Sequence, residues 1–586
     1  MNLKNLKIGI HQINTITGDI KGNLQKIKDE ILNDKNKNAD ISIFPETAIT
    51  GYMCGSLWDN INFVNDQDEK IDDIHEYVKE IKYNGIVIIG FIDFLGLKSN
   101  RFPYLKNAVA VISKSGPIGI YHKQLLASSD HHEDKKYFDK GDESKVFSVD
   151  LPNIGKIRIG VVICEDAWTN DHRKDIPGEM VLKYGADLLI NINQSYFYYG
   201  KQEKRIKQFS QISRLYKVPF ISVNSCSIGD ILKNIVIFDG GSIIFNENGQ
   251  LIFEAPKFKE HNEILSYNKL KELEHKTFSK YEEITNALVF EQKEFFKLIG
   301  INKAQVHISG GIDSAVVAAL VVKAMGKENV VFITNPSNLN VESLKYVQLL
   351  EDKLGVNIWV NPIQSIFEHF MVSHKSSFNK ELSLTGQATV QATIRTVQGL
   401  AASHQFNSGI VATGNHTEIA LGWSSFHDIG SIGVHTLIGD LTKTEVFQLA
   451  EFINKELYND NVIPEELYNG KFKPRAELPD AKEDPINYYL QSGICALLIR
   501  ERKSKQEIMN EFNSNKNRYW FLSDDLFPDQ PYLRSFSSEQ FEKEVDFAIS
   551  KMKKSVYKAA QGAPIVIISP RSRGFSNRET LINKYE

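Results

Sequence analysis

The chain has 586 residues, 42% of them apolar and 24% charged, and its formal net charge is −4. A chain of this length exceeds what one hydrophobic core can organise, so we expect two or more domains. The composition is that of a folded globular protein, and the small net charge excludes the basic surface typical of nucleic-acid binding. We therefore expect no nucleic-acid partner.

The four cysteines are widely scattered without C-x-x-C spacing; they are Cys54, Cys164, Cys226 and Cys495. This spacing argues against a zinc site and a disulfide framework, and it favours a reducing compartment. No apolar run approaches the ~18 residues that a membrane span requires, and the first residues lack the apolar stretch of a signal peptide. We expect a cytoplasmic protein without a membrane partner.

Short apolar runs typical of β-strands recur from Lys7 to about Pro256, and helical patterns lie between several of them. The predicted strands are residues 8–10, 41–44, 86–89, 108–112, 157–163, 188–192, 220–223 and 243–245, and the predicted helices are 23–32 and 71–81. Strands that alternate with helices indicate an α/β fold. Residues 235–238 and 243–245 are predicted to pair antiparallel across Asp239-Gly240-Gly241.

A highly charged stretch, residues 261–285, is predicted to be a linker with some helix. Beyond it strands and helices alternate again, at residues 330–333, 341–354, 356–360, 387–404 and 409–411. That alternation predicts a doubly wound parallel sheet, whose ligand should lie at the carboxyl ends of the strands. We expect a first domain over residues 1–260 and a second over 286–586, in which the fold of 511–586 is not assignable.

A glycine loop, Ser309-Gly310-Gly311-Ile312-Asp313-Ser314, joins the apolar run 306–308 to the apolar run 315–325. This pattern predicts a strand, a tight turn and a helix. Glycines let backbone N–H groups approach an anion closely, and a helix start adds free donors, so the loop suits a phosphate. The Lys of the kinase and GTPase phosphate loop is missing. The alternative is a glycine turn that only connects strand to helix.

Three residues suited to nucleophilic catalysis at a carbonyl carbon stand at the ends of predicted strands. They are Glu46, Lys123 and Cys164. A carboxylate can take the thiol proton, a cation favours the thiolate and the oxyanion, and sulfur carries the acyl group. Taken singly, a cysteine after an apolar strand is usually core and a lysine is usually surface charge. One sheet edge could gather all three.

The Asp313 carboxylate needs further oxygen ligands if it holds Mg²⁺. The stretch Thr413-Gly414-Asn415-His416-Thr417-Glu418 follows the strand 409–411 and supplies Glu418 from a neighbouring strand end. Taken alone, this stretch is better explained as a simple turn and a helix N-cap.

Motifs in the first half resemble those of the nitrilase-type carbon-nitrogen hydrolases: Phe44-Pro45-Glu46, His122-Lys123-Gln124-Leu125, Cys164-Glu165-Asp166 and Phe238-Asp239-Gly240-Gly241-Ser242. The resemblance implies an αββα sandwich with Glu46, Lys123 and Cys164 as catalytic triad, and Ser195 and Lys201 as glutamine-binding residues. Tyr196 stands where the family usually has Pro, and Ser129 where it has a Tyr that contacts glutamine. The family's accessory Glu corresponds to Asp134 in strict register, or to Glu133 with a one-residue slip.

Motifs in residues 286–575 resemble the NAD synthetase family: the Ser309 loop, the Thr413 stretch, Thr385-Gly386-Gln387-Ala388, Gly422-Trp423, Asp440-Leu441-Thr442-Lys443-Thr444, Pro474-Arg475-Ala476-Glu477-Leu478, Tyr557-Lys558 and Ala563-Pro564. A nitrilase-like domain followed by this domain is the arrangement of glutamine-dependent NAD synthetases. The resemblance implies that glutamine supplies ammonia, and that ATP activates nicotinic acid adenine dinucleotide by adenylylation before ammonia forms the amide of NAD. A homo-oligomer is also implied.

The same resemblance implies which substrate or ion each residue binds. ATP is expected at Ser309, Gly310, Gly311, Ile312, Asp313, Ser314 and Thr413, Mg²⁺ at Asp313 and Glu418, phosphate contacts at Arg395 and Lys443, and the dinucleotide at Thr389, Glu418, Trp423 and Lys558. Two alternatives stay open. One is a ligase that uses another carboxylate or a urea-type carbonyl as acceptor, and the other is a catalytically idle nucleotide-binding sensor.

Overall fold

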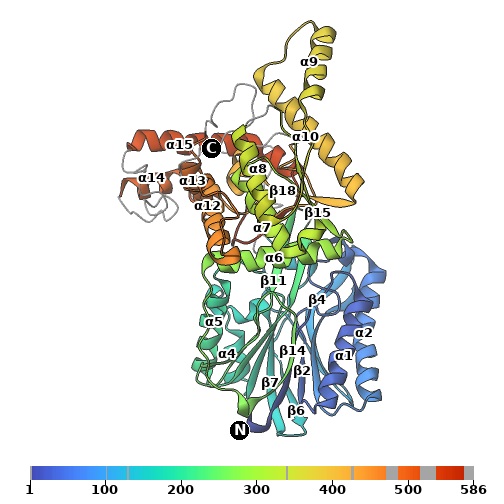
Figure 1. Ribbon diagram of the computed structural model, residues 1–586. Coiled ribbons are helices and arrows are strands. Elements are labelled where there is room, and N and C mark those ends of the chain that lie inside the picture. The colour runs from blue at the N-terminus through green and yellow to red at the C-terminus, as the bar shows by residue number, and fades with distance from the viewer. Residues whose placement is uncertain are drawn as a thin grey trace. The chain divides into compact units, whose positions relative to one another are not determined.

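The computed structural model describes residues 3–100, 102–128, 131–231, 233–337, 341–423, 428–469, 486–514 and 536–572 (Figure 1). The chain forms two compact units. Unit 1 comprises Met1–Ile231 and Val236–Phe278, and unit 2 comprises Leu232–Ile235 and Ser279–Glu586. Within the described ranges, none of the helices combines the length and the apolar character needed to cross a bilayer.

Unit 1 contains two six-stranded sheets. The first has the order β14 (His261–Ser266), β1 (Lys7–Gln12), β2 (Ile41–Ile43), β3 (Ile86–Leu97), β4 (Pro103–Ser113) and β5 (Gly116–His122). The second has the order β13 (Leu251–Glu254), β12 (Ile243–Phe245), β9 (Phe220–Asn224), β8 (Leu188–Asn193), β7 (Gly155–Ile163) and β6 (Val146–Leu151). Strands β1–β2–β3 and β7–β8–β9 are parallel, and the outer pairs are antiparallel.

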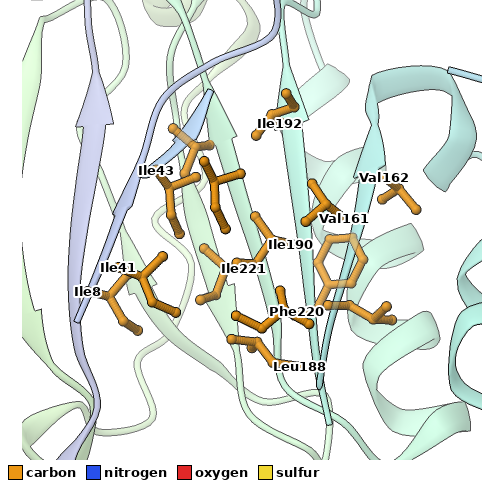
Figure 2. Close-up of a cluster of buried hydrophobic side chains, with 14 of the residues drawn as sticks. Ile8, Ile41, Ile43, Val161, Val162, Leu188, Ile190, Ile192, Phe220 and Ile221 are labelled. Carbon is orange, nitrogen blue, oxygen red and sulfur yellow. The ribbon is translucent and has the colours of Figure 1, made fainter. Parts of the chain in front are cut away.

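The two sheets of unit 1 pack face to face and each carries helices on its other face. Figure 2 shows Ile8, Ile41 and Ile43 of the first sheet beside Ile190 and Phe220 of the second. Helices α1 (Ile20–Asn36) and α2 (Ile61–Glu80) cover the first sheet, while α4 (Ile176–Leu182) and α5 (Lys201–Tyr216) cover the second (Figure 1). Strands buried on both faces read as continuous apolar runs, which is why the sequence revealed them. The predicted αββα sandwich is confirmed.

Two expectations for unit 1 differ from the structure. Residues 261–266, assigned to the linker from their charge, form the edge strand β14, which pairs with β1. The predicted antiparallel pair across Asp239-Gly240-Gly241 is wrong, because β12 pairs with β9 and β13 instead of β11 (Asn234–Asp239). Gly240 and Gly241 both have positive φ, 69° and 65°, and carry the chain between two different sheets rather than around a hairpin.

Unit 2 is built on a parallel sheet of order β20 (Ile565–Val566), β19 (His435–Thr436), β18 (Ser408–Ala412), β15 (Lys303–His307), β16 (Val330–Thr334) and β17 (Ile358–Val360). Asn234 and Ile235, at the start of β11, pair with β20. In chain order the sheet grows from β15 to β17, and β18 then returns to the other side of β15. This reversal defines the predicted doubly wound sheet, and ligands of such sheets generally bind in the crevice at the reversal, here between the ends of β15 and β18.

The remaining elements of both units are mostly helices. They are α3 (Asp134–Tyr137), β10 (Cys226–Ile231), α6 (Lys280–Leu298), α7 (Ile312–Met325), α8 (Val341–Leu354), α9 (Gln364–Phe378), α10 (Leu384–Phe406), α11 (His416–Leu421), α12 (Lys443–Phe452), α13 (Tyr488–Ile499), α14 (Lys505–Asn513) and α15 (Ser538–Gln561). The described part of residues 511–586, for which the sequence suggested no fold, therefore consists mainly of α15 and the short strand β20.

Candidate functional site

Cys164 lies at the turn that follows β7. Its backbone has a φ of 49°, in the left-handed region that non-glycine residues rarely occupy. The turn is held from β8, because the Asn191 Oδ1 atom accepts a hydrogen bond of 2.9 Å from the Cys164 backbone N–H. A strained residue at a strand end projects its side chain away from the sheet, as nucleophiles of hydrolases do. The thiol is nevertheless almost fully buried.

Glu46 and Lys123 form a buried ion pair. The Lys123 Nζ atom lies 2.7 Å from Glu46 Oε1 and 2.8 Å from Asp134 Oδ2. The Asn107 amide donates to Glu46 Oε1 at 2.7 Å, and the Gln194 backbone N–H donates to Glu46 Oε2 at 2.8 Å. These three partners of the Glu46 carboxylate are all donors, so its oxygens are satisfied by hydrogen bonds in the protein interior.

The electrostatics connect Cys164 to this ion pair. Burial raises the pKa of the Cys164 thiol, the Glu46 carboxylate raises it further, and the Lys123 ammonium lowers it. Burial by itself would lower the pKa of Lys123, but the Asp134 and Glu46 carboxylates outweigh it and the net shift is upward. The resting cluster therefore holds a charged lysine and a neutral thiol, with a carboxylate in electrostatic range of the thiol proton.

Of the two candidates for the accessory acid, Asp134 rather than Glu133 contacts Lys123. The Asp134 carboxylate is buried, pairs with Lys123 and accepts a hydrogen bond from the Tyr52 hydroxyl. Glu133 instead pairs with the exposed Lys136. Burial would raise the pKa of Asp134, but the Lys123 ammonium outweighs it and the net shift of the pKa is downward, which favours the carboxylate form. Tyr52 was not predicted, and its position after Thr-Gly was the only sequence signal for it.

Ser195 and Lys201 lie in the same unit. The Lys201 Nζ atom donates to the Tyr196 carbonyl at 2.7 Å and lies 4.3 Å from the centre of the Tyr196 ring. Cys164 opposes the downward shift of the Lys201 pKa, and Lys201 lowers the pKa of the Cys164 thiol. The Ser195 backbone N–H donates to Asn224 Oδ1 at 3.0 Å. Ser129, the remaining expected glutamine contact, lies outside the described residues.

The glycine loop of unit 2 forms the predicted turn between β15 and α7. Gly310 has a φ of 81°, and Gly311 is the N-cap of α7. The Ser309 hydroxyl accepts from the Gly311 backbone N–H at 3.2 Å and lies 3.2 Å from the Ser314 hydroxyl. The loop therefore presents backbone N–H groups at the positive end of a fourteen-residue helix, beside the crevice of the sheet.

Asp313 and Glu418 converge on one ammonium group. The Lys443 Nζ atom is ion-paired with Asp313 and lies 3.2 Å from Glu418 Oε1. The Asn415 amide donates to Asp313 Oδ1 at 3.0 Å, while Asn415 Oδ1 caps α11 at the Glu418 N–H. Burial raises the pKa of Glu418 to about 7, with Lys443 opposing and Asp313 adding to that rise. The sequence did not indicate that Lys443 would lie between the two acids.

This pair of acids fits a magnesium ion that also binds a nucleotide. In the part of the chain that is described, no three His, Cys, Asp or Glu side chains gather into a metal cage. Mg²⁺ is usually held by one or two protein carboxylates together with substrate phosphates and water, so two hard oxygen donors beside a phosphate loop suffice.

The other residues of unit 2 that are expected to bind substrate lie on several different elements. Thr413 accompanies the turn before α11, where its N–H donates to the Gly430 carbonyl at 3.1 Å. Lys558 of α15 donates to the Gly422 carbonyl at 2.8 Å, next to the half-buried Trp423.

Two further residues that are expected to bind substrate, Arg395 and Thr389, lie on α10. The Arg395 Nε atom donates to the Asn335 carbonyl at 3.0 Å. Thr389 lies exposed on α10, and its hydroxyl donates to the Thr385 carbonyl within the helix. The Pro474–Leu478 motif lies outside the described residues.

Comparisons with known proteins match a different family in each half of the chain. The carbon-nitrogen hydrolase family model matches residues 7–270, and the NAD synthase model matches residues 284–521. The glutamine-dependent NAD(+) synthetase of Synechocystis sp. is 29% identical over 528 residues, which cover 86% of this chain and 90% of that protein. The glutamine-dependent NAD(+) synthetase of Thermotoga maritima is 26% identical over 626 aligned positions, which cover 100% of both chains.

A solved structure shares the fold of the whole chain. The glutamine-dependent NAD+ synthetase from Acinetobacter baumannii, in complex with adenosine diphosphate, superposes with a TM-score of 0.71 at 24% identity, over 99% of this chain and 98% of the other. The two matched family models succeed one another along the sequence, and the relatives extend across both. The chain thus joins a segment matched by the carbon-nitrogen hydrolase model to one matched by the NAD synthase model, and it is similar to glutamine-dependent NAD(+) synthetases across both.

Proposed function

We propose that this chain makes NAD from nicotinic acid adenine dinucleotide, consuming ATP and the amide nitrogen of glutamine. In this proposal unit 1 is the glutaminase domain and unit 2 is the synthetase domain. The observation that carries the proposal is the buried cluster of Glu46, Lys123 and Cys164, because a synthetase fed by free ammonium has no need of a nucleophilic thiol. The names of the curated relatives support the same assignment.

The glutaminase reaction follows from the charges of the cluster. Glu46 takes the proton of the Cys164 thiol as sulfur attacks the side-chain carbonyl carbon of glutamine. The Lys123 ammonium stabilises the thiolate and the developing oxyanion. The C–N bond breaks, the amide nitrogen receives a proton and leaves as ammonia, and a thioester remains on Cys164. Water then cleaves the thioester and releases glutamate.

Lys201 and Ser195 are proposed to hold the substrate. The Lys201 ammonium would pair with the α-carboxylate of glutamine, and the Ser195 hydroxyl would contact its polar end. A buried carboxylate needs such a counter-charge, because removing an unpaired charge from water is costly.

Unit 2 is proposed to activate the acceptor. A carboxylate oxygen of the dinucleotide attacks the α-phosphorus of ATP, the bond to pyrophosphate breaks, and an acyl adenylate forms. Ammonia then attacks the acyl carbon, and AMP leaves. The Ser309–Ser314 loop would receive the departing pyrophosphate, with Arg395 and Lys443 as further cations.

The remaining side chains are proposed to place the two nucleotides. Thr413 would line the ATP site, Trp423 would stack on an aromatic ring, and Thr389, Glu418 and Lys558 would contact the dinucleotide. Mg²⁺ bound by Asp313 and Glu418 would supply neutralisation of the phosphate charge.

Product analysis of the wild-type protein tests the proposal. The protein is incubated with ATP, Mg²⁺, nicotinic acid adenine dinucleotide and either glutamine or ammonium, and NAD, AMP and pyrophosphate are quantified. Equal amounts of all three products with both nitrogen sources are expected. ATP cleavage that yields no NAD but proceeds with another acceptor would establish a different ligase. Nucleotide binding without cleavage of ATP or glutamine would establish a sensor.

The affinity for glutamine should depend on pH through Lys201. Burial, aided by the Arg205 guanidinium, lowers the pKa of Lys201 to about 7. The protonated amine binds the substrate carboxylate, so the KM for glutamine should rise as the pH is raised through about 7. Glutaminase kinetics between about pH 6 and 8.5 measure this rise. Lys201→Arg, which stays charged, should give a flat profile; a matching rise in that variant would contradict the role of Lys201.

We also propose that the chain acts in the cytoplasm as a homo-oligomer. All four cysteines are free thiols, as a reducing compartment requires. Several large apolar side chains of α9 and α10 are exposed, among them Val372, Phe378 and Val397. A gathering of exposed apolar side chains is typical of an interface, and light scattering would measure the number of subunits.

A further inference from the structure

The carboxylate of Asp166 connects the two loops that carry Lys123 and Cys164. Its Oδ1 atom accepts hydrogen bonds from the backbone N–H groups of Gln124, at 3.1 Å, and Leu125, at 2.8 Å. Its Oδ2 atom accepts from the Tyr121 hydroxyl at 2.8 Å and from the Ile163 N–H at 3.2 Å. Asp166 is completely buried, so these four donors are protein groups in a water-poor interior.

Two of these donors are adjacent in sequence to the proposed catalytic residues. Gln124 directly follows Lys123, and Ile163 directly precedes Cys164. The bond to Ile163 alone would be an ordinary cap of the short turn Cys164–Ala167. The bonds to Gln124 and Leu125 cross to residues about forty positions away, at the end of a strand in the other sheet of the sandwich.

We propose that Asp166 is a positioning residue of the glutaminase reaction, which sets the separation between the Lys123 ammonium and the Cys164 sulfur. The inference rests on the proposed function of this cluster and deepens it. An ammonium stabilises a thiolate and an oxyanion only when it stays at a fixed short distance, and displacement by about 1 Å can cost about 10²-fold in rate.

Replacement by asparagine removes this connection without changing the shape of the side chain. A carboxylate offers two acceptor oxygens, and each of them here receives two donors. An amide offers one oxygen and one NH₂ group, so in either orientation its NH₂ faces backbone N–H groups. In the variant Asp166→Asn, at least one loop therefore loses its hydrogen bond and is pushed away from the amide.

The test measures glutamine hydrolysis and the alkylation of Cys164 by iodoacetamide. We expect Asp166→Asn to lower kcat by about 10- to 100-fold and to slow alkylation, with KM for glutamine changed by less than about twofold. Asp166→Glu, which keeps both acceptor oxygens, should recover part of the lost rate. Tyr121→Phe removes a single donor and should show a smaller loss in the same direction, which keeps the test valid if Asp166→Asn fails to fold.

The matched control is Asp40→Asn. Asp40 is also fully buried and accepts from the Lys7 N–H at 2.9 Å and from Asn153, but it precedes β2, whereas Glu46 follows this strand. Asp40 and Glu46 therefore lie at opposite ends of β2, and Asp40→Asn should leave kcat and alkylation unchanged. Unchanged kcat and alkylation in folded Asp166→Asn, or equal losses in Asp40→Asn, would overturn the proposal. Absence of glutaminase activity in the wild type, with Asp166-dependent alkylation intact, would instead reject the proposed function.

Discussion

Replacement of Cys164 by alanine is expected to lower glutamine-dependent NAD formation by about 10³-fold or more, while ammonium-dependent formation keeps its wild-type rate. The reason is that sulfur forms the covalent bond to the acyl group, and the buried methyl group of alanine cannot replace it. The change removes one buried atom from a cluster whose ion pair, Glu46 with Lys123, stays intact. The synthetase unit should therefore fold and act normally.

The measurement is NAD formation with each nitrogen source in turn, together with glutamate release. Cys54→Ala is the matched control, because Cys54 is a second buried thiol of unit 1 whose pKa burial raises to about 12. It should keep both activities. If Cys164→Ala still used glutamine, or if it also lost the ammonium-dependent reaction, the assignment of Cys164 to ammonia release would be wrong.

Replacement of Asp313 by asparagine is expected to impair the synthetase reaction, whereas Cys164→Ala impairs only the supply of ammonia. NAD formation should fall by about 10²- to 10³-fold with glutamine and with ammonium alike, because the variant loses a carboxylate proposed to hold the Mg²⁺ that neutralises phosphate charge. Glutamine hydrolysis at Cys164 should continue. Lys443 keeps its contact of 3.2 Å with Glu418, so the interior of unit 2 retains a paired lysine and should stay folded.

The comparison with Asp460→Asn separates this effect from a general loss of negative charge. Asp460 forms an exposed ion pair with Lys353 in the same unit, 2.7 Å apart, and such pairs contribute little. NAD formation by this variant should equal that of the wild type. Normal NAD formation by Asp313→Asn would exclude the carboxylate from the ATP site, and a joint loss of glutaminase activity would indicate misfolding.

The sequence predicted strands correctly where both faces of the strand are buried. Strands β7, β8 and β9 are apolar runs because both their faces are covered, and their predicted positions agree with the structure. Helix α2 begins at Ile61, ten residues before the predicted start at Ile71. The early turns are rich in Asn, Asp and Gln, so apolar periodicity is weak there, although Asn60 caps the helix through its side chain.

Pairing between distant segments was not readable. His261–Ser266 is charged enough to look like a linker, yet it pairs with β1, more than two hundred residues earlier in the chain. An edge strand exposes one side, so its polar residues are compatible with a sheet although their composition does not indicate one. The same limit explains the wrong hairpin between β11 and β12, where local turn residues suggested a pairing that the two sheets do not make.

The sequence by itself determined the α/β fold class and the residues at the strand ends: Glu46, Lys123, Cys164 and the Ser309–Ser314 loop. These features depend on local patterns, because apolar runs define strands and glycines define turns. Only the tertiary structure decided that Asp134 rather than Glu133 pairs with Lys123, that Lys443 lies between Asp313 and Glu418, and that Asp166 joins two loops. Those contacts depend on which strand ends meet in space, and the charge of a buried side chain is decided by the partners that meet it there.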